Sequence, residues 1–159
     1  MNARDILFYG NRTLMESMER VPPAERNTPG LIGWWSAREA LAHLSIFEAG
    51  LVQVLEAFLG GPEPTLMANM DSAKNDEMVA QKKDLNFDQV LAEYNANHAR
   101  VMELVEKISP ERLREVGAIP WYGPEYSLDD FLVYTFYGHK REHAARFEGF
   151  GDHLEGKDK

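Results

Sequence analysis

Two histidines near the C-terminal end of the chain have a spacing that suits metal binding. His139 and His143 are four residues apart in a segment with a helical pattern. Residues four apart on a helix lie on one face, one turn apart, so both imidazoles can reach the same ion. Leu132 and Phe147 share that face, which indicates that the pair points into the protein core. The pair is therefore a candidate metal site.

A third histidine, His43, lies beside an apolar stripe in an earlier helical segment. Three neutral imidazoles leave coordination positions free for water or substrate, as catalytic sites do, whereas structural zinc is closed by four ligands. The residues alone leave two interpretations open, because a buried histidine is often a hydrogen-bonded core residue. Of the other histidines, we interpret His98 as structural or exposed and His153 as part of the tail.

Residues 139–143 also match the H-x-x-E-H pattern of inverted zinc metallopeptidases, in which the glutamate is the general base. A match of five letters has low specificity, and those enzymes resemble large α/β domains. Glu142 is next to His143, so a helix turns it about 100° away from the metal-facing side. A peptidase is therefore disfavoured, and Glu142 is interpreted as an exposed residue.

Four amphipathic segments must position these histidines. Each has apolar residues at three- and four-residue steps, and Pro or Gly residues separate the segments. The predicted helices cover residues 5–21, 36–58, 86–108 and 127–150, with a short extra turn at 109–113. The long connection 59–85 is expected to contain part of a helix within 67–82. The pattern predicts an all-α four-helix bundle.

The composition sets limits on function. The 159 residues include 17 Lys and Arg against 26 Asp and Glu, giving a net charge of −9, and no cysteine. Disulfides, thiolate metal sites and a cysteine nucleophile are excluded, and the acidic charge disfavours nucleic-acid binding. The N-terminus is charged, and no apolar run reaches the roughly 20 residues of a membrane span. We expect a cytoplasmic domain over residues 1–153, with a disordered tail at 154–159.

Three motifs occur in a specific order along the chain. Residues 35–44 read Trp-Ser-Ala-Arg-Glu-Ala-Leu-Ala-His-Leu, with an acid following at Glu48. Residues 86–113 form a long helix followed by a Ser-Pro-Glu-x-Leu turn, and residues 137–143 close with H-x-x-x-H. In this order and separation the motifs resemble the DinB/YfiT-like superfamily over nearly the whole chain.

This resemblance implies an up-up-down-down four-helix bundle with a metal site formed by His43, His139 and His143. It also implies a divalent ion, typically zinc or nickel, and often a homodimer. Characterised members of the superfamily include metal-dependent transferases and isomerases that use a small cellular thiol, and other members resemble hydrolases or toxin-resistance proteins. In this chain a sulfur nucleophile would have to come from a cosubstrate, because the chain has no cysteine.

The predicted function is a metal-dependent enzyme, a thiol-assisted transferase or isomerase or a hydrolase, that acts on a small molecule. One alternative is a noncatalytic metal- or ligand-binding resistance protein, and another is a structural dimer whose histidines belong to the core. Trp121 and Tyr122, in the loop before the last helix, are candidates for lining the substrate pocket. Glu48 is a candidate carboxylate for orienting a ligand imidazole.

Overall fold

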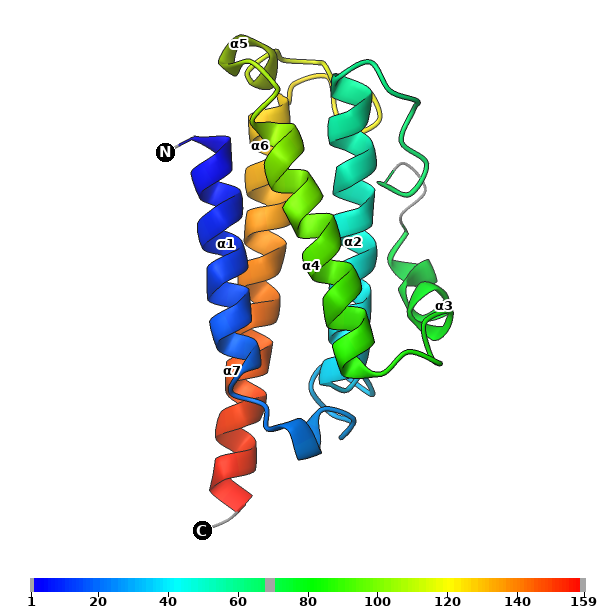
Figure 1. Cartoon of the computed structure of the whole chain (residues 1–159), viewed down its shortest axis with the longest axis vertical. Coiled ribbons are helices and arrows are strands. Elements are labelled where there is room, and N and C mark those ends of the chain that lie inside the picture. The colour runs from blue at the N-terminus through cyan, green and yellow to red at the C-terminus, as the bar shows by residue number, and fades with distance from the viewer. Residues whose placement is uncertain (1, 68–70, 158–159) are drawn as a thin grey trace.

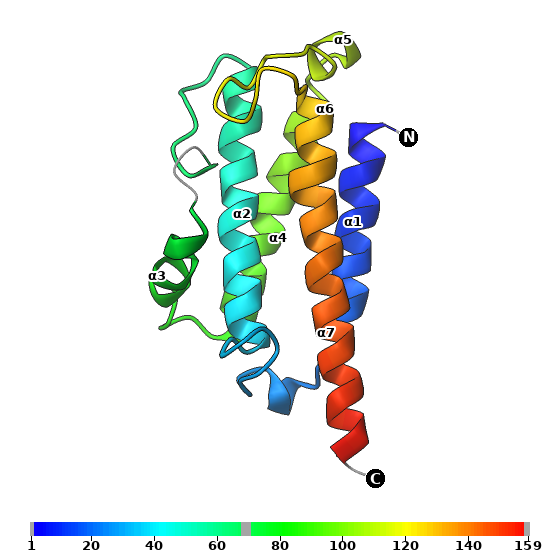
Figure 2. The same ribbon diagram turned by 180° about the vertical axis from the view of Figure 1, so that it is seen from behind.

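The computed structural model describes residues 2–67 and 71–157, and within these ranges every regular element is a helix. Four long helices form a bundle (Figures 1 and 2). They are α1 (Ala3–Met18), α2 (Ala37–Phe58), α4 (Phe87–Val105) and α7 (Gly138–Lys157). The all-α prediction is confirmed.

Shorter elements complete the chain. The long helix that contains α7 begins without a break as α6 and passes through a π-helical segment, η4, before α7 starts. The short elements are η1 (Pro23–Glu25), η3 (Ser72–Lys74), α3 (Asn75–Ala80), α5 (Pro110–Leu113), α6 (Leu128–Phe131) and η4 (Leu132–Tyr137).

The helix directions differ from the up-up-down-down order that was expected. In Figure 1, α1 and α7 run down the bundle, whereas α2 and α4 run up it. The reason is the long connection after α2, which returns along the outside of the bundle, so α4 starts at the same end as α2 and runs parallel to it. The closest packing is between α2 and α4 and between α1 and α7.

Side-chain caps explain where three of the helices begin. In each case a polar side chain accepts a hydrogen bond from the backbone N–H three residues on, and the side chain there accepts one from the cap. These capping boxes satisfy backbone donors that a helix start otherwise leaves unpaired. The pairs are Ser36 with Glu39, Asn86 with Gln89, and Ser127 with Asp130. All three starts agree with the sequence prediction.

Several segments differ from their prediction in extent. α1 covers residues 3–18 rather than 5–21, and α4 ends at Val105 rather than at residue 108. In the connection expected to be partly helical over 67–82, helical turns occupy 72–80, and residues 68–70 lie outside the described residues. At the C-terminus, α7 continues to Lys157, so residues 154–157 are helical rather than part of a disordered tail. Leu154 packs against the core, which gives this last turn a reason to stay helical. Residues 158–159 lie outside the described residues.

The apolar core consists of two clusters stacked along the bundle. One contains the second half of α1, the first halves of α2 and α4, and most of α7. The other contains the first half of α1, the second halves of α2 and α4, and the α6–η4 segment. Between these two clusters lies a layer of polar side chains, one from each long helix, which we call the middle layer. These side chains are Asn11, Glu48, His98 and Lys140.

Helix α2 is long and apolar enough to cross a membrane if only length and composition are considered. Most of its apolar window is nevertheless buried against the other helices. It also carries the buried polar residues His43 and Glu48. These properties are those of the central helix of a bundle core.

Candidate metal centre

Three histidine side chains meet between α2 and α7. The Nε2 atom of His139 lies 3.0 Å from Nε2 of His43 and 2.9 Å from Nε2 of His143. His43 and His143 are buried and His139 is partly buried. One ligand nitrogen from each residue lies within 4.8 Å of the other two. The structure therefore brings together the three histidines that the sequence singled out.

Local helix geometry positions these side chains. The capping box at Ser36 begins α2, which places His43 in the second turn of a rigid helix. His139 and His143 follow the π-helical segment, in which the N–H of Gly138 donates to the carbonyl of Val133, five residues back. A π turn holds one extra residue, so it rotates everything after it by about 100° relative to a continuous α-helix. The wide turn thus sets which face of α7 carries the two histidines.

Aromatic rings pack on two of the three imidazoles, those of His43 and His139. The ring centre of Phe47 lies 4.6 Å from that of His43 and 4.4 Å from that of His139. Trp35 lies 5.1 Å from His43, and its indole N–H donates to Asp76 of α3 at 3.0 Å. These contacts restrict the orientation of the imidazoles and displace water from their faces. They also connect the long α2–α4 connection to the site.

The surroundings keep the histidines neutral. Burial, together with the neighbouring His139, lowers the pKa of His43 to about 3. Burial and the nearby imidazoles likewise lower the pKa of His143 to about 3. Burial and the charge of Lys140 lower the pKa of His139 to about 4. At neutral pH each imidazole therefore has a free lone pair, which is the form that binds metal ions.

The three facing nitrogens fit a metal ion better than they fit one another. Nε2 of a neutral His139 either donates one proton or accepts one, so it can satisfy only one of its two neighbours. A cation accepts a lone pair from all three atoms at once. Two nitrogens bound to one ion at about 2.0–2.1 Å lie about 2.8–3.4 Å apart, from octahedral to tetrahedral coordination, and the two spacings of His139 fall in this range. The three histidines are therefore a donor set that could hold a metal ion.

A second polar cluster lies next to this site in the middle layer. The Glu48 carboxylate accepts a hydrogen bond from His98 Nδ1 at 2.6 Å, and it pairs with Lys140 Nζ at 2.9 and 3.1 Å. Burial alone would raise the pKa of Glu48, but the Lys140 charge and the His98 hydrogen bond hold it below its usual value. The orienting role suggested for Glu48 stays a prediction, since its partners are His98 and Lys140.

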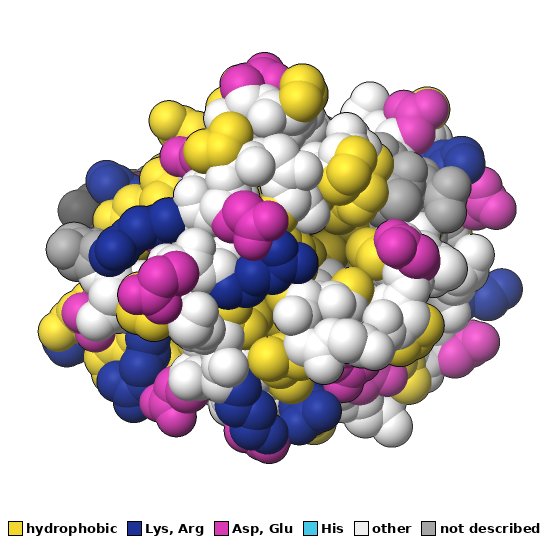
Figure 3. Space-filling model, turned by 90° about the horizontal axis from the view of Figure 1, so that it is seen from above, with side chains coloured by type: hydrophobic (Ala, Val, Ile, Leu, Met, Phe, Trp, Pro, Cys, Tyr) yellow, Lys and Arg dark blue, Asp and Glu magenta, His cyan; other side chains and the backbone are white. Residues whose placement is uncertain are grey.

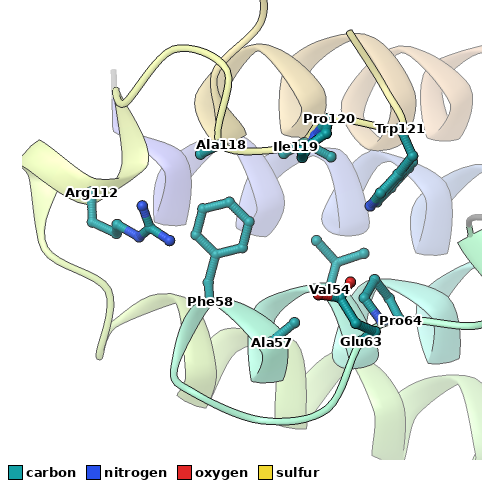
Figure 4. Close-up of a pocket in the computed structure, with 10 residues that line it drawn as sticks. All are labelled: Val54, Ala57, Phe58, Glu63, Pro64, Arg112, Ala118, Ile119, Pro120 and Trp121. Atoms are coloured by element: carbon teal, nitrogen blue, oxygen red, sulfur yellow. The ribbon is translucent and has the colours of Figure 1, made fainter. Parts of the chain in front are cut away.

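The two aromatic residues predicted to line a substrate pocket lie away from the histidines. Trp121 borders a cavity of about 340 Å³ at the end of the bundle where α2 ends, together with Phe58 and Arg112 (Figure 4). Viewed from that end, hydrophobic side chains form the floor of a hollow that charged side chains border (Figure 3). Tyr122 packs on Phe131 and Tyr126.

This cavity and the histidines occupy different levels of the bundle. Ala57 lines the cavity, and it is fourteen residues after His43 on the same helix. At about 1.5 Å per residue the two levels are about 21 Å apart along α2. The structure thus does not bring Trp121 to the three histidines, and a role for Trp121 and Tyr122 toward a substrate stays a prediction.

Other residues near the site are placed differently from what their sequence positions indicated. Glu142 is exposed, as expected. His98 is buried and hydrogen bonded, which agrees with the structural interpretation. Sequence reasoning missed Lys140, which is only 2% exposed. The position of Lys140 directly after His139 was an available signal for a role near the site. It is a weak signal, because lysines are normally solvent-exposed.

A family model described as the DinB superfamily matches residues 9–145. The match covers most of the chain and includes all three histidines. The chain therefore belongs to the DinB superfamily. No curated protein and no solved structure gave a match to this chain.

Proposed function

We propose that this DinB-superfamily protein binds one divalent transition-metal ion through His43, His139 and His143, and that it is a metal-dependent enzyme acting on a small molecule. The observation that carries the proposal is the convergence of three neutral imidazole nitrogens on one point. Zinc and nickel are the ions we expect, because imidazole suits both. The reactions we expect are thiol-assisted transfer or isomerisation, or hydrolysis.

An ion held there would lower the pKa of a water or thiol bound to it, so that a nucleophile forms near neutral pH. The protein's own residues have simpler tasks. The three neutral ligands leave the positive charge uncompensated, which favours an anionic partner. Phe47 packs on His43 and His139 and Trp35 packs on His43, so these rings restrict two of the imidazoles and exclude water from their faces. The chain has no cysteine, so a thiol nucleophile would be a cosubstrate.

One observation favours the alternative of a noncatalytic metal- or ligand-binding protein. The ring contacts of the three imidazoles come from one another and from Trp35 and Phe47. The nearby carboxylate of Glu48 is engaged by Lys140 and His98, so it is not free to serve as a general base. An enzyme with this site would therefore rely on the ion or the substrate for proton transfer.

Two further parts of the proposal rest on the family and on composition. Membership in the superfamily suggests a homodimer in solution. The net charge of −9 supports a cytoplasmic protein that does not bind nucleic acid or a membrane surface. Light scattering of the purified protein tests the dimer directly, since a monomer of 18.1 kDa is easily distinguished from a pair.

The experiment that tests the function begins with metal content. The untagged protein is purified without added metal, and metals are measured by elemental mass spectrometry beside His43→Ala and His139→Ala variants. His153→Ala is the control, because His153 is an exposed histidine of the same chain. We expect about one ion per chain in the parent and the control, and almost none in the two site variants, with helical circular dichroism retained.

The second measurement separates an enzyme from a binding protein. The metal-loaded protein is screened with small thiols and electrophilic acceptors and with hydrolysable esters and amides, and each hit is repeated with His139→Ala. Turnover that depends on the histidines supports the enzyme. Metal binding without turnover would support the noncatalytic alternative. Absence of metal after incubation with zinc and nickel would overturn the proposal.

A further inference from the structure

The strongest feature outside the three histidines is the buried cluster of Glu48, His98 and Lys140. The Glu48 side chain is 0% exposed and that of Lys140 is 3% exposed, and their charged atoms are 2.9 Å apart. Glu48 comes from α2, His98 from α4 and Lys140 from α7. A full positive and a full negative charge therefore lie inside the apolar bundle, at the level between its two hydrophobic clusters.

Stability alone does not account for this arrangement. Removing two charges from water is costly, and replacing a buried ion pair by apolar side chains of similar volume is often neutral or stabilising. A bundle that needed only a core would be served as well by leucine and methionine at these positions. What an ion pair provides, and an apolar contact does not, is a short, directional link between two particular atoms.

The packing of the bundle shows where such a link is needed. α2 packs mainly on α4 and α7 packs mainly on α1, so the helices that carry the histidines belong to different pairs. His43 must nevertheless meet His139 and His143 to within a few tenths of an ångström for all three to hold one ion. Glu48 and Lys140 connect α2 to α7 directly at this level.

The link is also in the right place along each helix. Glu48 is five residues after His43, about 7.5 Å along the axis and about 140° around it. Lys140 directly follows His139, about 100° around α7. A register shift of α7 by one residue, about 1.5 Å along and 100° around its axis, would turn Lys140 away from Glu48 and break their ion pair. Apolar contacts are non-directional and would select against such a shift less sharply.

We propose that the buried Glu48–Lys140 ion pair, supported by His98, is a positioning device that sets the register of α7 against α2 and so brings His139 and His143 onto His43. Glu48 and Lys140 are positioning residues, because neither belongs to the group of three histidines that would hold the ion. Tyr94 extends the same layer: its ring is stacked 6.2 Å from that of His98, and its hydroxyl donates to Asn11 of α1 at 2.7 Å. The layer thereby includes all four long helices. This inference rests on the proposed metal site.

The test replaces the ion pair by apolar side chains of similar size, Glu48→Leu together with Lys140→Met. Co²⁺ alone is the probe, because its visible absorption reports the arrangement of the ligands as well as binding. We expect a double variant with parental helicity and an unchanged urea midpoint, but with Co²⁺ affinity reduced about tenfold or more and an altered absorption spectrum. A purely structural pair would leave the spectrum of the bound ion unchanged.

A matched control removes another interhelical ion pair. Arg100 of α4 and Glu56 of α2 are 3.2 Å apart at the surface, and Glu56→Leu with Arg100→Met makes the same chemical change there. This control should bind Co²⁺ as the parent does. Glu48→Asp provides a second test that keeps both charges but shortens the link by one methylene, and it should also weaken Co²⁺ binding while the helical signal is retained.

The outcomes separate the two proposals. If the parent protein does not bind Co²⁺, the proposed metal function fails. If the parent binds Co²⁺ and a folded Glu48→Leu/Lys140→Met variant binds it with the same affinity and spectrum, the positioning inference is overturned. If the double variant does not fold, Glu48→Asp decides by the same two readouts, since it retains the charges.

Discussion

This bundle contains two neighbouring buried polar clusters that differ in one respect. Glu48, Lys140 and His98 pair with one another: Oε1 of the carboxylate accepts from the ammonium and from an imidazole N–H, and Oε2 lies 2.9 Å from the ammonium. The three imidazoles cannot do this, because they are neutral and their Nε2 atoms face each other at 2.9–3.0 Å. The first cluster is neutralised by the protein's own charges, whereas the second presents three lone pairs that a metal ion could accept.

The comparison teaches how burial can be used in two ways. In the closed cluster, formed by Glu48, Lys140 and His98, opposite charges offset the cost of desolvation and hold Glu48 ionised. In the open cluster, formed by the three imidazoles, no opposite charge offsets burial. Burial therefore lowers the pKa of each histidine and keeps the imidazoles neutral. Four predictions test this difference, in order of decreasing expected effect.

Opening the closed cluster should have the largest effect. Glu48→Gln leaves the Lys140 charge buried without its counter-ion, so the free energy of unfolding should fall by about 3–5 kcal/mol. Urea denaturation of the metal-free protein measures this loss. The control is Glu16→Gln, which removes an exposed pair with Arg12 and should change stability by about 1 kcal/mol or less. Equal, small losses in both variants would contradict the closed-cluster interpretation.

Acid should destabilise the metal-free protein, because the three histidines of the open cluster resist protonation in the folded state. The pKa values of the three histidines are lower in the folded chain, at about 3 to 4, than the ordinary value of 6.5. As pH falls below 6.5 the unfolded chain binds protons that the folded chain does not, so stability is lost progressively until the folded pKa values are reached.

The size of this acid effect can be stated between pH 7.5 and 5.5, above the range where most carboxylates titrate. One pH unit below the unfolded pKa, each histidine costs about 1.4 kcal/mol, or about 4 kcal/mol for three. Urea titrations at several pH values measure it. A His43→Gln variant should show a correspondingly shallower dependence, and an unchanged slope would contradict the lowered pKa of His43.

Zinc should stabilise the open cluster selectively. A ligand that binds only the folded state at 100 times its dissociation constant adds about 2.7 kcal/mol to the free energy of unfolding. We expect this gain for the parent protein in thermal or urea unfolding and its loss in His143→Ala. A gain that persists in His143→Ala would place the binding elsewhere on the chain.

The smallest effect should come from Asp76, at the edge of the three-histidine site. Asp76→Ala removes the acceptor for the indole N–H of Trp35, which packs on His43. The loss of one hydrogen bond should cost about 1 kcal/mol of stability, with a modest drop in zinc affinity. Glu77→Ala, an exposed change on the same short helix, is the control. Equal zinc affinity in both variants would indicate that α3 does not support the site.

The local parts of this description could be predicted from the sequence because they depend on neighbours along the chain. Helix starts follow from capping residues such as Ser36 and Glu39, which act within one turn. The shared face of His139 and His143 follows from the helical repeat alone. The meeting of His43 with this pair came from the family resemblance, since nothing local relates residues 96 positions apart.

Several features of the site depended on contacts between helices and so were not predictable from the sequence. The π-helical segment before Gly138 has no marker in the sequence. In the sequence Lys140 is only a variable position of the H-x-x-x-H motif, and lysines are almost always exposed. Its burial depends on the facing carboxylate of α2, which offsets the cost of desolvation. The separation of Trp121 from the histidines depends on where each lies along the bundle axis, which is defined only once the helices are packed.

The sequence by itself thus determined that the chain is helical, where three of its helices begin, and which two histidines share a face. These are short-range properties, set by hydrogen bonds and side-chain spacing within a few turns. Only the tertiary structure decided the directions of the helices, the pairing of Glu48 with Lys140, and the convergence of three imidazoles between α2 and α7. Such features depend on which surfaces meet, and each surface is defined by residues far apart in the chain.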